Sequence, residues 1–121
     1  MNGKDLVIDF LRTLEARDLP KAKAMLAPGM KMAFPGDKVM DSLEELVAWS
    51  KSRYKFARKT FDKFDEAVID GKTVVYSMGT LSGEWLDGTP FSNVRYVDRF
   101  EIVNGRITDQ KVWNDLAEFR K

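Results

Sequence analysis

Asp98 is the residue whose type and position most clearly call for a chemical explanation. It lies in a run in which every second residue faces the same way, and this row reads Val94, Tyr96, Asp98, Phe100 and Ile102. Because side chains alternate across a strand, the mostly apolar row is expected to face a core. A lone carboxylate there costs several kcal/mol unless it is hydrogen-bonded, paired or protonated. Asp98 is therefore expected to have either a structural partner or a functional role.

The residue types that the chain lacks limit the chemistry available to Asp98. The sequence contains no Cys and no His. Disulfides, thiolate nucleophiles and thiolate metal sites are thereby excluded, and the commonest general base and metal ligand is missing. The sequence predicts no metal site and no cofactor.

Length and composition predict one globular domain spanning residues 1–121. Hydrophobic residues make up 44% and charged residues 32% of the 121 positions, which is ordinary for a soluble protein with a single core. The 20 basic and 19 acidic residues give a net charge of +1, so the composition favours neither nucleic acid nor an anionic membrane as a partner. The basic run at residues 51–59 is interpreted as a solvated helix end. With no signal peptide and no membrane-length apolar run, the expected location is cytoplasmic.

The N-terminal half of the chain, which must help to position Asp98, has mostly helical patterns. Apolar residues recur at helical spacing near the N-terminus, Asp18 and Pro20 are helix-start signals, and Ser42 with Glu45 has the spacing of a capping box. The elements expected in this half are a helix at residues 3–17, a short helix that ends before Pro28, a short strand at residues 30–34, and a long helix from Ser42 to Ala57.

From Thr60 onward the pattern favours strands. Asp70-Gly71, Asp87-Gly88 and Asn104-Gly105 are tight-turn dipeptides between β-rich runs. They predict an antiparallel meander with strands near residues 60–69, 72–85, 91–103 and 106–116. Gly79 and Gly83 mark places where the second strand bends sharply. Helices followed by a curved antiparallel sheet predict an α+β fold with three N-terminal helices covering the concave face.

Several short stretches carry a resemblance to a known family. They are Phe34-Pro35-Gly36, the run from Gly83 to Phe91, the run from Tyr96 to Glu101, and the stretch from Asn104 to Ile107. Together they resemble the SnoaL-like branch of the nuclear-transport-factor-2-like superfamily over essentially the whole chain. The resemblance implies a cone-shaped barrel with a mostly apolar pocket, often in a homodimer formed through the sheet. It fixes no reaction, because this superfamily hosts several enzymes and also proteins without catalysis.

The resemblance to ketosteroid isomerase places Asp98 on the protonated, hydrogen-bond-donating carboxyl of that enzyme. The same alignment places Phe10 on its tyrosine and Phe34 on its carboxylate base, so two catalytic groups are replaced by hydrocarbon. Epoxide hydrolase activity is disfavoured in the same way, because Val112 stands where the resemblance implies a carboxylate and Met78 lies near another required polar position. The acid/base residues of polyketide cyclases and scytalone dehydratase include a His, which this chain lacks.

Strand parity and the resemblance together predict a pocket with mostly apolar or amphipathic walls, the usual make-up of a small-molecule site. Simple core packing is the alternative explanation for Phe10, Phe34, Met78 and Val112. The expected lining residues are Phe10, Phe34, Trp49, Tyr54, Tyr76, Met78, Tyr96, Asp98, Gln110, Val112 and Asn114.

Two interpretations of Asp98 remain open. In one it belongs to a satisfied polar network with Tyr54, Tyr96 or Asn114. In the other an apolar pocket raises its pKa, so that it acts as a catalytic acid or oxyanion stabiliser, assisted by Tyr54.

Three functions follow as hypotheses. The first is binding of a small hydrophobic or ring-containing metabolite without catalysis. The second is an isomerase, cyclase or lyase acting on a carbonyl compound, and the third is a structural or partner-binding dimer with a filled cavity. A homodimer is expected through the outer sheet face, with Trp85, Trp113, Arg95 and Arg99 as the surface residues.

Overall fold

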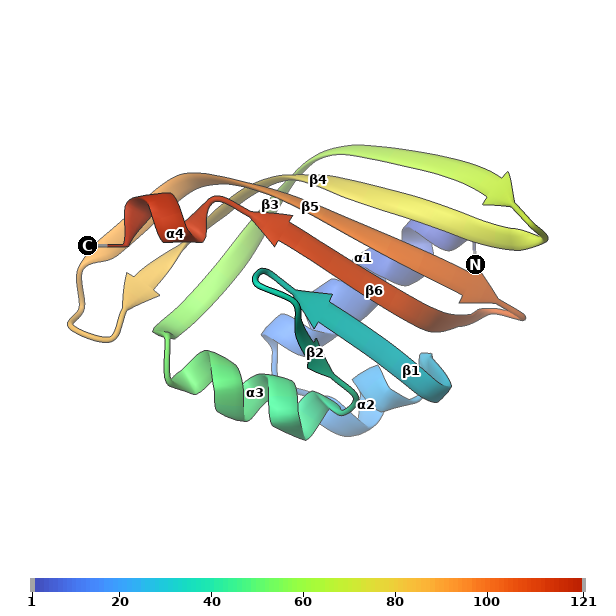
Figure 1. Cartoon of the computed structure of the whole chain (residues 1–121), viewed down its shortest axis with the longest axis horizontal. Coiled ribbons are helices and arrows are strands. Elements are labelled where there is room, and N and C mark those ends of the chain that lie inside the picture. Colours follow the sequence, from blue (N-terminus) through green and yellow to red (C-terminus); the bar gives the residue numbers. More distant parts are fainter. Residues whose placement is uncertain (1, 121) are drawn as a thin grey trace.

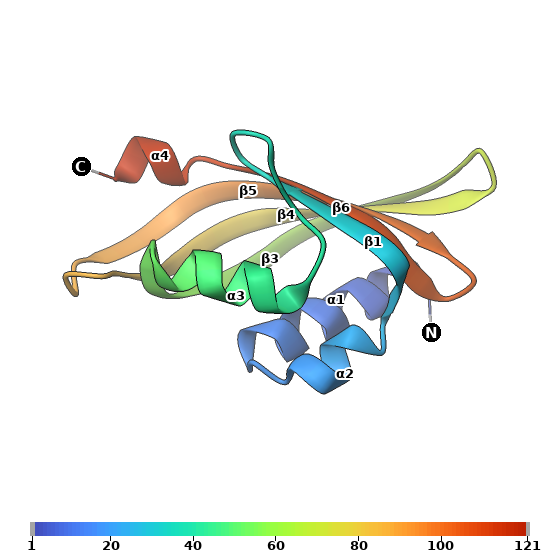
Figure 2. The same cartoon turned by 60° about the horizontal axis from the view of Figure 1, so that its bottom comes forward.

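The protein is a single curved sheet of six strands, with the three N-terminal helices on one side and a short C-terminal helix at one end (Figure 1). The computed structural model describes residues 2–120. Along the sheet the strand order is β2 (Lys38–Met40), β1 (Leu26–Phe34), β6 (Arg106–Asn114), β5 (Pro90–Val103), β4 (Lys72–Trp85) and β3 (Tyr54–Ile69). Turning the molecule shows α1, α2 and α3 together on the concave side of this sheet (Figure 2). The predicted α+β class, with helices over the concave face, is confirmed.

The first two helices begin at the positions that the sequence predicts. Helix α1 spans Gly3–Glu15 and is capped by Asn2, whose side-chain oxygen accepts a hydrogen bond from the Asp5 N–H at 2.8 Å. Helix α2 spans Leu19–Lys23, with Asp18 as its cap. Each cap satisfies a backbone N–H that the first helical turn leaves free. Within residues 2–120 no helix is long and apolar enough to cross a membrane.

Helix α3 is shorter than the sequence predicts. It spans Leu43–Lys51, and Ser42 caps it by accepting a hydrogen bond from the Glu45 N–H at 3.1 Å. The expected continuation to Ala57 is wrong, because the chain enters strand β3 (Tyr54–Ile69) three residues after α3 ends. Ala57 there pairs with Gly83 of the neighbouring strand. Sheet pairing with a distant segment therefore overrides the local helical pattern.

The remaining strands form the predicted meander with two additions. Strands β3 to β6 are antiparallel neighbours, while β1 runs parallel to β6 and pairs with the short strand β2. The sequence did not predict β2 or the C-terminal helix α4. The bounds are β1 Leu26–Phe34, β2 Lys38–Met40, β4 Lys72–Trp85, β5 Pro90–Val103, β6 Arg106–Asn114 and α4 Leu116–Phe119.

Gly79 and Gly83 allow β3 to lie unusually close to β4. A Cβ atom added to Gly79 would stand 2.0 Å from the Thr60 carbonyl oxygen, and one added to Gly83 would stand 2.0 Å from the Phe56 carbonyl oxygen. Register shifts occur in the facing segments of β3. The two glycines thus permit the bend that carries the first half of β3 over the concave face.

The core has two parts. The larger part packs α1 against the sheet, with Phe10 meeting Phe100 edge to face at a centroid distance of 6.1 Å. The smaller part lies toward α4 and includes Phe91, Tyr96 and Leu116. Residues from both parts meet around one cavity, which makes the cavity the natural place to look for a site.

Candidate functional site

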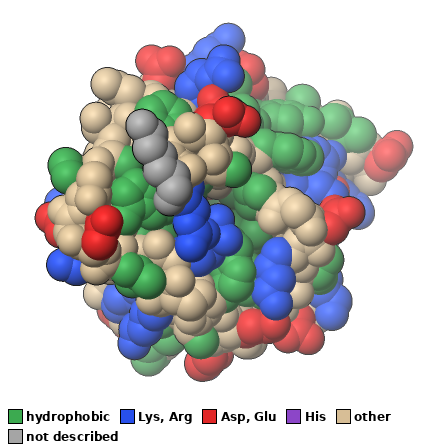
Figure 3. Space-filling model, turned by 60° about the vertical axis from the view of Figure 1, so that its left-hand side comes forward, with side chains coloured by type: hydrophobic (Ala, Val, Ile, Leu, Met, Phe, Trp, Pro, Cys, Tyr) green, Lys and Arg blue, Asp and Glu red, His purple; other side chains and the backbone are tan. Residues whose placement is uncertain are grey.

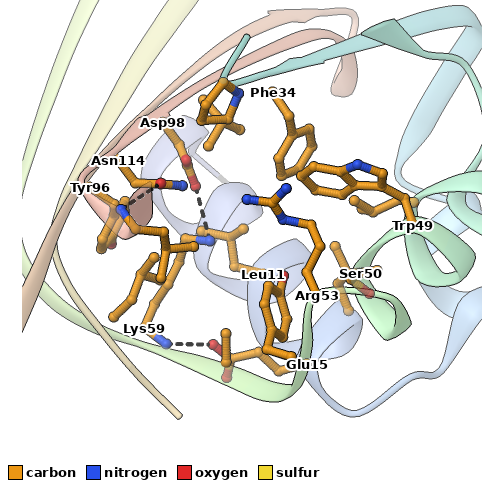
Figure 4. A pocket seen from close by; sticks show the side chains of 18 of the residues that line it. Leu11, Glu15, Phe34, Trp49, Ser50, Arg53, Lys59, Tyr96, Asp98 and Asn114 are labelled. Carbon is orange, nitrogen blue, oxygen red and sulfur yellow. Dashed lines mark hydrogen bonds and ion pairs between the residues drawn. The ribbon is translucent and has the colours of Figure 1, made fainter. Parts of the chain in front are cut away.

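A cavity of about 90 Å³ lies between the helices and the concave face of the sheet. Its walls come from α1, α3, β3, β5 and β6, so it is built from most of the chain (Figure 4). Most lining side chains are aliphatic or aromatic, and the polar ones are few. The lining residues are Leu11, Leu14, Glu15, Arg17, Phe34, Pro35, Leu46, Trp49, Ser50, Arg53, Tyr54, Ala57, Lys59, Leu81, Tyr96, Asp98, Gln110, Val112, Asn114 and Leu116.

The structure brings most of the expected lining residues together around this cavity. On β5 and β6 the inward-facing pairs are Asp98 with Val112 and Tyr96 with Asn114. Phe34 at the end of β1 and Trp49 of α3 meet edge to face at 5.2 Å and form an aromatic wall of the cavity. The expected residues that line the cavity are Phe34, Trp49, Tyr54, Tyr96, Asp98, Gln110, Val112 and Asn114.

Three expected lining residues lie elsewhere, and their placement corrects the sequence-based prediction. Phe10 is fully buried in the core against Phe100, as the alternative of simple packing anticipated. Tyr76 and Met78 lie on the convex face of the sheet. Tyr76 pairs with Arg99, whose Nε donates a hydrogen bond to the tyrosine hydroxyl at 3.2 Å. Because cross-strand partners share a face, the partner of Arg99 cannot face the cavity.

The expected outer-face group also needs one correction. Trp113 pairs with Val97 and is 51% exposed on the convex face. Trp85 instead packs on Phe91 at 4.6 Å, within the smaller part of the core. It shares the parity of Leu81 and points to the concave side, so the prediction that Trp85 joins Trp113 on the outer face is wrong.

Asp98 is completely buried and its charged partner is Lys59. The Lys59 Nζ lies 3.4 Å from the Asp98 Oδ2, and Figure 4 shows the two side chains meeting at the cavity wall. Neither carboxylate oxygen has a hydrogen-bond partner among residues 2–120. Burial raises the pKa of Asp98 above its ordinary value of 3.8, and the Lys59 ammonium opposes that rise. The carboxyl is thus ion-paired through Oδ2 but keeps unused capacity to accept hydrogen bonds, above all at Oδ1.

The tyrosines do not form the polar network expected around Asp98. The Tyr96 hydroxyl pairs with the Ser77 hydroxyl at 2.9 Å. Burial raises the pKa of Tyr96 to about 12, so this phenol stays neutral. Its hydroxyl is already hydrogen-bonded to Ser77. Burial also raises the pKa of Tyr54. Both rings contribute apolar wall and neither serves as a base at neutral pH.

The Arg53 side chain extends into the space between Asp98 and the aromatic wall (Figure 4). Its guanidinium stacks over the Trp49 ring at 4.6 Å and points toward the Asp98 side of the cavity (Figure 4). The Arg53 Nε is buried and has no hydrogen-bond partner in the described chain. Buried polar atoms are normally paired, so this one calls for a missing partner.

An open groove adjoins the cavity at Arg53. It encloses about 730 Å³ and is lined by Trp85, Leu86, Pro90 and Phe119, among others. The end of the molecule that carries α4 comes forward in Figure 3, where basic and hydrophobic side chains lie next to one another. Since Arg53 lines both spaces, it stands between the cavity and the groove.

Lys59 and Arg53 were missed by the sequence-based prediction. Both belong to the basic run at residues 51–59, which was interpreted as a solvated helix end. As a strand, residues 57–61 place Ala57, Lys59 and Phe61 on one face, and that alternation was the available signal for Lys59. Arg53 precedes the strand, so the alternation gives no signal for it. Within the described residues there is no group of three or more Asp, Glu, His or Cys side chains placed to hold a metal ion.

The raised pKa of Asp98 predicts a particular dependence of stability on pH. The folded protein keeps this proton at pH values where the unfolded chain has released it. The contribution of Asp98 is therefore fully present below pH 3.8 and is lost as the pH rises toward the folded-state pKa. Relative to Asp98→Asn, the free energy of unfolding should fall over this interval, which urea titrations at pH 4, 5, 6 and 7 will measure. A difference that stays flat or grows with pH would contradict the assignment.

A curved sheet that holds a cavity beneath covering helices defines the nuclear-transport-factor-2-like class of fold. The chain belongs to the SnoaL-like domain family, whose model matches residues 7–110. The resemblance stated from the sequence is thereby confirmed. No curated protein matches the sequence.

Solved structures agree with this fold. An NTF2-like protein of unknown function from Burkholderia pseudomallei is 21% identical, with a TM-score of 0.82, over 98% of this chain and 95% of that one. TerC, co-crystallised with polyporic acid, is 16% identical with a TM-score of 0.77, over 95% and 92%. A Catenulispora acidiphila protein with a ketosteroid isomerase-like fold, in complex with trimethylamine, is 14% identical with a TM-score of 0.72, over 89% and 83%. At these identities the similarity shows the fold alone.

Proposed function

We propose that the protein binds a small, mostly apolar, ring-containing molecule in the cavity beneath Asp98. The observation that carries the proposal is a cavity with aromatic walls and unpartnered buried polar atoms. Asp98 Oδ1 and Oδ2, Gln110 Oε1 and Arg53 Nε all lack hydrogen-bond partners among residues 2–120. An apolar wall with a few free polar groups is the usual make-up of a small-molecule site.

The size of the cavity limits the ligand. An engineered apolar cavity of roughly 150 Å³ holds benzene, so the present volume of about 90 Å³ accommodates a single small ring only after a modest outward shift of a wall. Arg53 is the wall residue with room to shift, because it also borders the open groove. Because about 90 Å³ stays free of side chains, the hypothesis of a structural protein with a filled cavity is disfavoured.

Two of the similar structures support the choice of a small molecule. TerC was co-crystallised with polyporic acid, and the Catenulispora acidiphila protein is a complex with trimethylamine. Small molecules therefore accompany this fold in proteins with similar chain paths, although the low identity carries no ligand over to this chain.

Filling the cavity should weaken binding. Ala57→Leu adds three carbons to a cavity wall on β3, so titration with phenol, followed by quenching of tryptophan fluorescence, should show at least a roughly tenfold weaker affinity than in the parent protein. Ala67→Leu, at the exposed end of the same strand, is the matched control and should bind as the parent does. Equal affinity in both variants would place phenol outside the cavity and defeat the proposal.

A catalytic role is the second candidate, and the buried carboxyl of Asp98 favours it. A protonated Asp98 would donate to a ligand carbonyl and stabilise a developing oxyanion. Phe34 lines the cavity where the resemblance places a base, so the proton acceptor would have to be another group. Turnover of cyclic ketones or enones that disappears in Asp98→Asn, in a variant that still binds phenol, would support this candidate.

A homodimer through the convex sheet face is proposed on the basis of Trp113. This side chain is 51% exposed, next to Val97 and Met78 on the same face, and a second copy would bury that apolar strip. Trp113→Lys is expected to convert a dimer to a monomer in sedimentation equilibrium. Leu86→Lys, at another exposed apolar position, is the control and should leave the mass unchanged. A parent protein that is already monomeric would refute the proposed dimer.

A further inference from the structure

The side chains that line the cavity include more cations than carboxylates. Two carboxylates line the cavity, and each lies within ion-pair distance of a cation. Glu15 lies 2.8 Å from the Arg12 guanidinium, and Asp98 lies 3.4 Å from the Lys59 ammonium. Two further lining cations are left over, and both are arginines.

Neither of these arginines has an acidic partner within the described residues. Arg17 donates to the Leu14 carbonyl at 3.0 Å and lies 3.5 Å from the Ser50 hydroxyl. Arg53 has no carboxylate within ion-pair distance in the part of the chain described, and its buried Nε has no hydrogen-bond partner. Stacking on Trp49 holds one face of the Arg53 guanidinium and leaves the edge of its donor fork free.

We infer that the ligand carries a carboxylate group, which binds Arg53 while the ring packs against Phe34, Trp49 and Tyr54. This inference rests on the proposed function and specifies its ligand class as a small cyclic carboxylic acid. The planar guanidinium fork matches a carboxylate with two parallel hydrogen bonds. In a water-poor cavity such bonds are stronger than at an exposed surface.

The position of Arg53 also explains how an anion reaches the cavity. Arg53 lines both the cavity and the open groove, so an acid entering through the groove meets a cation first. The charge of Asp98 does not oppose the acid strongly, because the Lys59 ammonium 3.4 Å away balances it. The carboxylate of the ligand thus pairs with Arg53, which has no carboxylate partner among the described residues.

Benzoate and benzamide test the inference, because they have nearly the same shape and differ in charge. Their dissociation constants are measured by isothermal titration calorimetry at pH 7 and low salt, with the full chain. Benzoate is expected to bind roughly tenfold or more tightly than benzamide, the range of a charged hydrogen bond. In Arg53→Met the preference should fall to about one, mainly by weakening benzoate. Arg106→Met, at the exposed first position of β6, should keep the parent preference.

The outcomes separate this inference from the proposed function. Equal binding of both probes to the parent protein overturns the carboxylate assignment and leaves ring binding intact. Binding of neither probe overturns both. A preference for benzoate that survives in Arg53→Met removes Arg53 from the site. The comparison of the two probes in the parent protein decides the question even if Arg53→Met fails to fold.

Discussion

Replacing Lys59 with methionine is expected to lower the free energy of unfolding by about 3 kcal/mol at pH 7, the lower end of the cost of removing one partner from a buried ion pair. Lys59 is the cation 3.4 Å from a carboxylate that has no exposed surface. Without it Asp98 must stay charged and unpaired or take up a proton, and both cost free energy at neutral pH. Urea unfolding at pH 7, with the same buffer for all variants, measures the loss.

Two controls identify the cause of that loss. Lys63→Met removes a lysine of the same strand whose ion pair with Asp65 is well exposed, and it should change stability by less than about 0.5 kcal/mol. The double variant Lys59→Met/Asp98→Asn also removes the carboxylate that Lys59→Met leaves without a cation, and it should recover most of the lost stability. The deficit of Lys59→Met should also shrink as the pH falls, because protonation of Asp98 removes the charge that Lys59 balances. A double variant as unstable as Lys59→Met would show that packing, and not charge, is responsible.

Replacing Gly79 with alanine is expected to cost about 3 kcal/mol of stability, at the upper end of the usual cost of overpacking. The new Cβ would lie 2.0 Å from the Thr60 carbonyl oxygen, and a backbone atom in a paired strand cannot move aside alone. Strand β3 would have to separate from β4. Because β3 carries Ala57 and Lys59 to the cavity, phenol binding should weaken together with stability.

Ser82→Ala is the matched control for Gly79→Ala. Ser82 lies on the same strand, pairs with Arg58 of β3 and is partly exposed, so removal of its hydroxyl should change stability by less than about 0.5 kcal/mol. Thermal unfolding followed by circular dichroism compares the two variants. Equal melting temperatures for Gly79→Ala and the parent protein would mean that the strands do not approach as closely as the structure describes.

Much of the fold follows from local patterns that the structure keeps. The alternation around Asp98 gave the correct face for every member of its row, because β5 is a central strand with one side on the core. Asn104-Gly105 and Asp70-Gly71 join antiparallel neighbours as expected, with all four residues at positive φ. Turn chemistry and single-face burial are local properties, so they can be read from a single sequence.

The residues that the sequence-based prediction placed wrongly are those whose positions depend on pairing between distant strands. The segment after Lys51 has a helical pattern of apolar residues, but pairing with β4 makes it a strand. In β4 the residues from Val74 to Met78 are nearly all apolar or small, so their parity carries little information. The side that Tyr76 takes is set by its partner Arg99, and nothing local to β4 specifies that register.

The charged residues of the site were the hardest to foresee. Asp98 was found because it interrupts an apolar row, whereas Lys59 and Arg53 lie in a run of basic residues where no single one stands out. Their roles arise only when β3 crosses the concave face and brings Lys59 opposite Asp98 of β5, while Arg53, in the turn just before β3, comes to line the same cavity. A site assembled from distant segments leaves a weak signal in each segment.

Binding of a ring-containing molecule inside the cavity is tested most directly by the indole N–H resonances of the three tryptophans in a ¹H–¹⁵N correlation spectrum during titration with benzoate. Trp49 lines the cavity, Trp85 lines the open groove, and Trp113 lies exposed on the convex face. We expect the Trp49 resonance to shift with saturation while Trp113 stays in place. Shifts confined to Trp85 or Trp113, or no shift at all, would contradict a binding site beneath Asp98.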